Sequence, residues 1–189
     1  MSTVRTFIAV ESSGAVASRA AALIERLRAA DAKVTWVAPE NMHWTLKFLG
    51  DIDLTQTADI CRAVGEAAAP VAPFDVEVQG VGAFPNLARP RAVWLGVGKG
   101  REQLISLAAA IDARLAAIGF KPEGRRFSPH LTIGRVRGEK NLPELADQLE
   151  QRADYPAGMM EVDEVVVFAS YLERGGPIHE PLGHLPLRG

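Results

Sequence analysis

The stretch His43-Trp44-Thr45-Leu46 recurs further along the chain as His130-Leu131-Thr132-Ile133. Successive side chains of a β-strand point to opposite faces. Each copy therefore places its histidine and threonine on one face and its two apolar side chains on the other. The pattern predicts two strands, each with a polar pair facing a cleft and an apolar pair facing a core. One copy alone is a weak signal, because His and Thr also occur on half-buried strands for packing reasons.

The two copies lie 87 positions apart, and the same offset aligns other parts of the chain. It aligns Arg5–Val10 with Ala92–Val97, and most apolar residues of one segment align with apolar residues of the other. An internal duplication explains this agreement most simply. Duplicated halves usually pack about a pseudo-two-fold axis, which would bring His43 and His130 face to face.

The duplication predicts two α+β halves within a single domain that spans residues 1–189. The halves cover roughly residues 4–85 and 92–172, and we expect residues 86–91 to connect the two lobes. The tail, residues 173–189, has no counterpart and is expected to add an edge strand or to wrap a lobe. A chain of 189 residues is long enough to bury a substantial core.

Hydrophobic periodicity predicts a similar order of strands and helices in each half. The expected strands are 4–10, 34–37, 43–49, 74–79, 92–97, 127–136 and 161–172. The expected helices are 16–30, 54–69, 104–118 and a short one that follows Asn141. Gly50 and the segment 80–85 are expected to end the strands that precede them.

The composition is that of an ordinary soluble globular protein, with 48% apolar residues, 23% charged residues and a net charge of −2. The whole molecule is therefore not a generic nucleic-acid binder. No apolar run reaches the roughly 20 residues of a membrane span, and no secretory signal pattern opens the chain, so we expect a cytoplasmic protein. Cys61 is the only cysteine, which excludes an internal disulfide.

Positive charge is concentrated around the second His-x-Thr copy. Between residues 121 and 140, six basic side chains accompany Glu123 and Glu139. The basic residues are Lys121, Arg125, Arg126, Arg135, Arg137 and Lys140. This excess favours a site for a phosphate group, although a solvated basic loop has the same composition.

Three common kinds of site fit the sequence poorly. Zinc needs three or four ligands, but His179 and His184 are the only other histidines and lie in a Gly/Pro-rich tail, where we expect surface residues. No G-x-S-x-G elbow is present for a serine nucleophile. The segment 96–100 fits neither the dinucleotide-binding nor the P-loop pattern. We therefore expect neither a metal nor a cofactor.

Two facing imidazoles suit in-line displacement at a phosphodiester. With an ordinary histidine pKa of about 6.5, one ring can accept a proton from the attacker while the other donates one to the leaving oxygen. Thr45 and Thr132 lie on the same faces, where their hydroxyls could donate to non-bridging phosphate oxygens. Strict alternation also adds Lys47 to the first face and Arg126 and Ser128 to the second, and the two cations could bind phosphate.

The motifs resemble the 2H phosphoesterase superfamily, and within it the bacterial and archaeal RNA 2′,3′-cyclic phosphodiesterase group, also called 2′-5′ RNA ligase or LigT-like. The resemblance covers essentially the whole chain and rests on three strings. These are His43-x-Thr45-Leu46-Lys47-Phe48-Leu49-Gly50, Gly82-Ala83-Phe84-Pro85 followed by Trp94-Leu95-Gly96, and Ser128-Pro129-His130-Leu131-Thr132-Ile133-x-Arg135. It implies an α+β fold of two lobes around a central cleft, each lobe an antiparallel sheet with helices on the outside.

The implied reaction is metal-independent hydrolysis of an RNA-terminal 2′,3′-cyclic phosphate to a 2′-phosphomonoester. By this resemblance His43 is the proton donor for the 3′-oxygen and His130 the acceptor from water, which the residue pattern alone leaves open. Phe84 and Arg135 join the expected substrate-binding residues, although strict alternation places Arg135 opposite His130. The expected partners are RNA ends and small nucleotides, bound by a monomer.

A non-catalytic nucleotide- or RNA-binding module would use the same cleft. Intact histidine and threonine in both copies favour the enzyme. The reverse reaction, 2′-5′ RNA ligation, would use the same residues, so the sequence does not separate it from hydrolysis.

Overall fold

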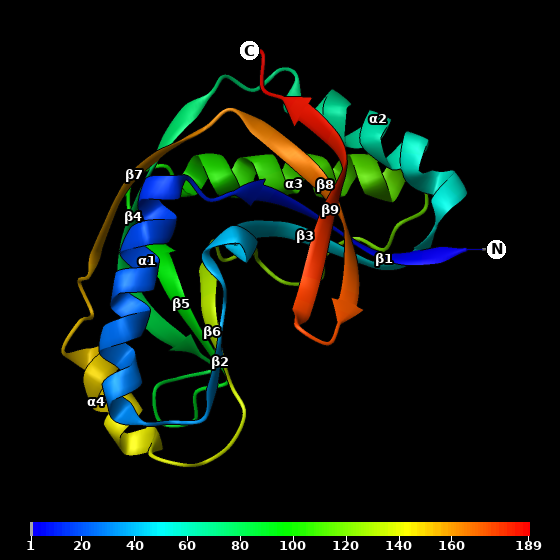
Figure 1. Ribbon diagram of the computed structural model, residues 1–189. Coiled ribbons are helices and arrows are strands. Elements are labelled where there is room, and N and C mark those ends of the chain that lie inside the picture. The colour runs from blue at the N-terminus through cyan, green and yellow to red at the C-terminus, as the bar shows by residue number, and fades with distance from the viewer. Residues whose placement is uncertain (1) are drawn as a thin grey trace.

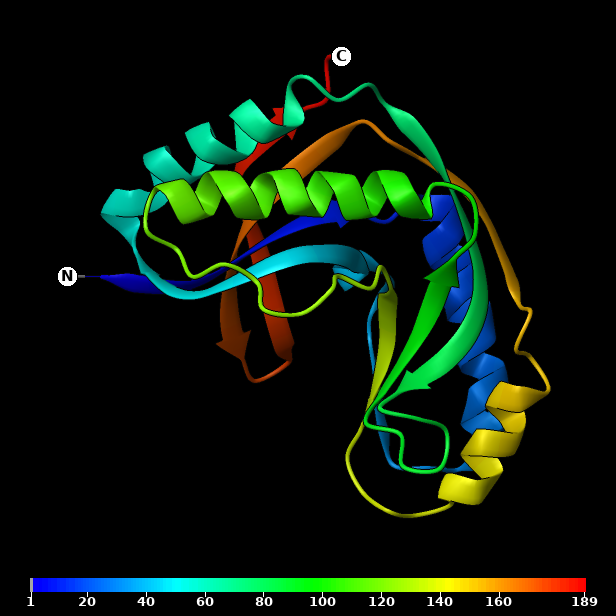
Figure 2. The ribbon, with the colours of Figure 1, turned by 180° about the vertical axis from the view of Figure 1, so that it is seen from behind.

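The computed structural model describes residues 2–189 and contains two antiparallel β-sheets with helices on their outer faces (Figures 1 and 2). Sheet A has the strand order β3-β1-β8-β9, and sheet B has the order β2-β6-β5-β4-β7. The predicted α+β class, with antiparallel sheets and outer helices, is confirmed. No helix of residues 2–189 is both long enough and apolar enough to cross a membrane.

The secondary structure follows the predicted order, except that two strands, β7 and β8, replace the single strand predicted over 161–172. The strands are β1 (Thr3–Glu11), β2 (Val34–Trp36), β3 (His43–Asp53), β4 (Phe74–Phe84), β5 (Ala92–Val97), β6 (Leu131–Val136), β7 (Pro156–Val162), β8 (Glu164–Glu173) and β9 (Gly176–Pro186). The helices are α1 (Gly14–Leu27), α2 (Thr57–Ala68), α3 (Arg101–Ala117) and α4 (Leu142–Glu150), with 3-10 turns η1 (Arg28–Ala30), η2 (Pro39–Asn41) and η3 (Leu54–Gln56).

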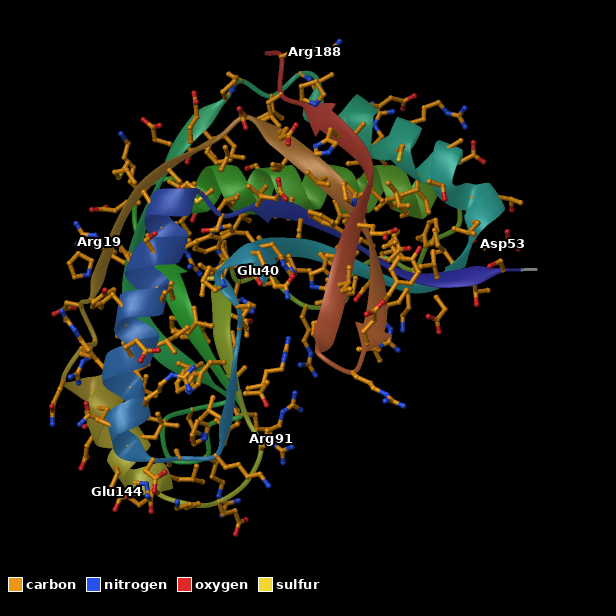
Figure 3. All side chains as sticks on the ribbon, viewed as in Figure 1. Arg19, Glu40, Asp53, Arg91, Glu144 and Arg188 are labelled. Atoms are coloured by element: carbon orange, nitrogen blue, oxygen red, sulfur yellow. The ribbon has the colours of Figure 1, made fainter. Side chains whose placement is uncertain are left out.

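The helices divide between the two sheets. Helices α2 and α3 pack on sheet A, while α1 and α4 pack on sheet B. Each helix buries an apolar face, as Leu23 and Leu27 of α1 illustrate, because apolar area removed from water drives this packing. Figure 3 shows the charged Arg19 and Glu144 on the outer sides of α1 and α4, away from sheet B.

The strand order supports the duplication and corrects the expected division into lobes. Under the 87-residue offset, β3-β1-β8 of sheet A corresponds to β6-β5-β4 of sheet B. Each of these three-stranded units takes two strands from one half of the chain and one from the other. Segment 86–91 was expected to connect the lobes, but it joins β4 to β5, which pair within sheet B. A lobe is therefore not one half of the chain. Of the two alternatives expected for the tail, the structure shows an edge strand, β9.

Two glycines expected to end strands lie instead at irregular points within them. Gly50 and Gly80 have φ values of 74° and 80°, which glycine adopts without steric cost. Both positions adjoin shifts in strand register, and β3 and β4 continue to Asp53 and Phe84. The glycines therefore accommodate bends without ending the pairing.

The strands that carry the His-x-Thr copies have β-bulges at equivalent positions. In β3, Lys47 pairs with Ile8 and Thr45 with Ala9, which leaves Leu46 as an extra residue. In β6, Gly134 pairs with Val93 and Thr132 with Trp94, and the extra residue is Ile133. An extra residue reverses the alternation of side chains beyond it. Lys47 and Arg135 therefore each lie on the face of their own strand opposite to the one predicted.

Candidate active site

The two His-x-Thr copies lie where the sheets meet. Strands β3 and β6 belong to different sheets but contact each other. The segment that leads into β3 is anchored to sheet B, because the Val37 N–H donates to the Ile133 carbonyl at 2.9 Å. Figure 2 shows the chain between α3 and β6, residues 118–130, running alongside β3.

Both histidine rings are held by the same contact. The Nδ1 atom of His43 lies 2.7 Å from the Asn41 carbonyl oxygen, and that of His130 lies 2.7 Å from the Ser128 carbonyl oxygen. A carbonyl only accepts hydrogen bonds, so each Nδ1 carries the proton. Both Nε2 atoms are thereby left for proton transfer to or from a ligand.

The ring of His43 packs against aromatic side chains. Its ring stacks on Phe7 with a centroid separation of 4.7 Å, and Phe7 stacks in turn on Phe168. Burial, the largest cause, lowers the pKa of His43 to about 4, and the positive charges of His179 and Arg135 act in the same direction. The hydrogen bond to Asn41 opposes the shift but does not cancel it. His43 is therefore neutral at pH 7 in the free protein.

We expect the His43 imidazole of the free protein to titrate near pH 4, which NMR of the ring resonances measures, with a His43→Ala spectrum for assignment. Because this folded-state pKa lies below the ordinary value of 6.5, protonation favours the unfolded chain. The contribution of neutral His43 to the free energy of unfolding is therefore complete above pH 6.5 and is lost as the pH falls toward 4. A midpoint near 6.5 would contradict the burial argument.

His130 has a different aromatic neighbour. The ring of Phe84, at the end of β4, meets the His130 ring edge-on at a centroid separation of 4.9 Å and also contacts Trp94. Phe84 is 36% exposed, so part of its ring remains free for another contact. The structure thus brings Phe84 beside His130.

Lys47 does not share the face of His43, and this prediction was wrong. Its side chain is buried on the side of sheet A that faces α3, because the bulge at Leu46 reverses the alternation. The Nζ atom donates to Asp112 of α3 and, at 2.9 Å, to the carbonyl of Lys121. Lys47 therefore ties β3 to α3 and to the start of the segment that leads to His130.

Arg135 was expected opposite His130, but the bulge at Ile133 returns it to the face of Thr132. It is exposed, and its charge lies close enough to His43 to lower the pKa of that ring. Arg126 and Ser128 do not belong to the strand predicted from residue 127, because β6 begins at Leu131. Both are exposed, and Ser128 contributes the carbonyl that holds His130.

The prediction that His179 is a surface residue was also wrong. It is half-buried on β9, with its ring centroid 5.1 Å from that of His43. No signal in the sequence identified it, because the tail has no counterpart in the duplication and its alternating neighbours, Pro177 and Pro181, give no clear face. His184 of the same strand is exposed, as predicted, and contacts Glu164. Among residues 2–189, no group of three or more His, Cys, Asp or Glu side chains is arranged to hold a metal ion.

Comparisons with known proteins agree with the motif resemblance. The RNA 2′,3′-cyclic phosphodiesterase of Methanothermobacter thermautotrophicus is 37% identical over 176 residues, covering 93% of this chain and 95% of that protein. The protein of the same name from Thermotoga maritima is 34% identical over 185 residues, covering 98% of this chain and 96% of that protein.

Solved structures show the same fold. A protein from Thermus thermophilus has a TM-score of 0.81 at 24% identity over 98% of both chains. Apo Escherichia coli LigT has a TM-score of 0.78 at 24% identity over 100% of both chains. The family model of the 2′-5′ RNA ligase superfamily matches residues 6–172, and the chain belongs to this superfamily.

Proposed function

We propose that the protein is a cyclic phosphodiesterase that hydrolyses RNA-terminal 2′,3′-cyclic phosphate to a 2′-phosphomonoester. The observation that carries the proposal is the matched pair of histidines, each with Nδ1 fixed by the carbonyl two residues earlier, one at the start of β3 and the other directly before β6, which contacts β3. The names of the curated relatives support it. So do the reported complexes of Escherichia coli LigT with 3′-AMP and with phosphate.

In the proposed reaction, the cyclic phosphate lies between the two Nε2 atoms. The neutral His130 ring accepts a proton from water as the water oxygen bonds to phosphorus. The bond from phosphorus to the 3′-oxygen breaks, and His43 donates a proton from Nε2 to that oxygen. This assigns the donor role to the histidine whose free-state pKa is about 4, so bound substrate must raise that pKa until the ring takes up a proton from solvent at Nε2. The negative charge of a bound phosphodiester provides this effect, because an adjacent anion favours imidazolium.

Neighbouring side chains complete the proposed site. The hydroxyls of Thr45 and Thr132 donate to the non-bridging oxygens as negative charge builds there. Arg135 adds positive charge near the phosphate, and Phe84 presents its exposed ring surface to the nucleoside beside His130. Arg126 increases the local attraction for RNA from the exposed segment that precedes β6. Because one chain supplies both histidines, the proposed reaction needs no second subunit, and the two imidazoles make both proton transfers without a metal.

An oligoribonucleotide ending in 2′,3′-cyclic phosphate, incubated with the protein in EDTA, tests the proposal. We expect conversion to a 2′-phosphate end, identified by its resistance to a 3′-specific phosphatase. The matched control is the same oligonucleotide ending in a 3′-phosphate, which should remain unchanged. Binding without conversion would identify a nucleotide-binding module, whereas activity that disappears in EDTA and returns with a divalent cation would contradict the metal-independent reaction.

A further inference from the structure

A third histidine lies against the His43 ring. His179 is perpendicular to His43 at a centroid separation of 5.1 Å and nearly perpendicular to Phe7 at 5.0 Å. Since the His43 and Phe7 centroids are 4.7 Å apart, the three rings form a compact triangle. They come from β9, β3 and β1, so the triangle exists only in the folded sheet.

Asn41 connects the two histidines. Its backbone carbonyl accepts the hydrogen bond from His43 Nδ1, and its side-chain Nδ2 donates to the Pro177 carbonyl at 3.2 Å. Pro177 lies two residues before His179 on β9. The residue that orients the first ring therefore also fixes the strand that carries the second.

One ring nitrogen of His179 takes no part in the hydrogen bonds among the described residues. Its Nδ1 is buried and has no hydrogen-bond partner within residues 2–189. A buried polar atom without a partner lowers the free energy of unfolding by roughly 1–3 kcal/mol, so a histidine at this position needs an explanation other than stability. His184 gives the contrast on the same strand, because its ring is exposed and its Nδ1 meets Glu164.

We propose that His179 is a positioning residue for His43, and that its ring and the Asn41 carbonyl together fix the direction in which His43 Nε2 faces substrate. This inference rests on the proposed function and extends it. Without the His179 ring, His43 loses the neighbour that closes the triangle and can rotate away from its contact with Phe7. A displacement of about 1 Å in a reacting group is enough to reduce the rate substantially.

The same proximity couples the charges of the two rings. His43 faces His179 from β9 and the Arg135 guanidinium from β6, while its contacts with β1 and β8 are the apolar rings of Phe7 and Phe168. A positive charge on His179 opposes a second one on His43, and burial lowers the pKa of His179 itself. Activity is therefore expected to decline at acidic pH as His179 takes up a proton.

Three variants test this role: His179→Ala, His179→Phe and, as the matched control on the same strand, His184→Ala. We expect His179→Ala to lower kcat by about 10- to 100-fold, with a much smaller change in KM. His179→Phe keeps a ring in place and should recover most of kcat at neutral pH. It also removes the titrating group, so the acidic limb of its pH profile and the NMR titration of His43 should both change. Circular dichroism verifies that each variant is folded.

A kcat for His179→Ala within twofold of that for His184→Ala would overturn the inference, and so would an unchanged His43 titration in His179→Phe. The NMR measurement needs no substrate, so it tests the coupling even if the wild-type protein lacks cyclic phosphodiesterase activity. Inactivity of the wild type would refute the proposed function, while an unchanged His43 titration in an active enzyme would refute only the role of His179.

Discussion

Replacing either His43 or His130 by alanine is expected to lower kcat/KM for the cyclic phosphate end by at least roughly 10²–10⁴-fold, the usual contribution of a positioned acid or base. Each change removes one of the two Nε2 atoms and leaves the other in place. Steady-state kinetics on the oligoribonucleotide measures the loss. The fold should survive, because both rings are only half-buried and, within the part of the chain that the structure describes, each substitution removes a single hydrogen bond, which joins the ring to a backbone carbonyl.

Two comparisons make this prediction specific. Thr45→Ala and Thr132→Ala should lower kcat/KM less than the histidine substitutions do, because a hydroxyl only stabilises charge while a histidine transfers a proton. His184→Ala should retain wild-type activity, since its contact is with Glu164 on the outer part of sheet A. Full activity in both His43→Ala and His130→Ala would refute the two-histidine reaction.

The repeated motif predicted much of the fold because strand alternation and internal similarity are local properties of a sequence. They were sufficient to place Trp44 and Leu131 in the core and to predict two related α+β halves, whereas the antiparallel sheets with outer helices were implied by the family resemblance. They were not sufficient to show which strands pair, because pairing depends on long-range packing. The offset of 87 residues identified equivalent strands, but it gave no indication that β4 and β8 would join the sheets of the opposite halves.

The errors for Lys47 and Arg135 share a physical origin. An alternation argument assumes one residue per pleat, and the bulges at Leu46 and Ile133 break that assumption in both copies. Lys47 therefore moved to the face of α3, and Arg135 moved to the face of Thr132. A bulge has no strong sequence signal here, since apolar residues occupy both bulged positions. His179 was missed for another reason, because only the pairing of β9 with β8 brings the tail to His43.

The buried contact between Lys47 and Asp112 leads to the second large effect. Asp112→Ala is expected to lower the free energy of unfolding by about 3 kcal/mol, because it leaves the buried Lys47 ammonium without its counter-ion. Asp112 also accepts hydrogen bonds from the Glu123 N–H at 3.1 Å, so the segment leading to His130 loses an anchor. Urea denaturation measures the change, and the weakened anchor should also reduce activity.

The nearby ion pair between Arg114 and Glu66 is the matched control, because α3 supplies one partner in each case but both of these side chains are more than half exposed. Glu66→Ala should cost less than about 1 kcal/mol, as exposed pairs usually do. If Asp112→Ala lowers the free energy of unfolding no more than Glu66→Ala does, the pair of Lys47 and Asp112 does not anchor β3 to α3.

The same pair predicts how stability depends on pH. Burial alone would raise the pKa of Asp112, but the hydrogen bonds from Lys47 and Glu123, together with the Lys47 charge, lower it below its usual 3.8. The stabilisation is therefore present above that value and is lost as the pH falls further, so wild type and Asp112→Ala should converge in stability at strongly acidic pH.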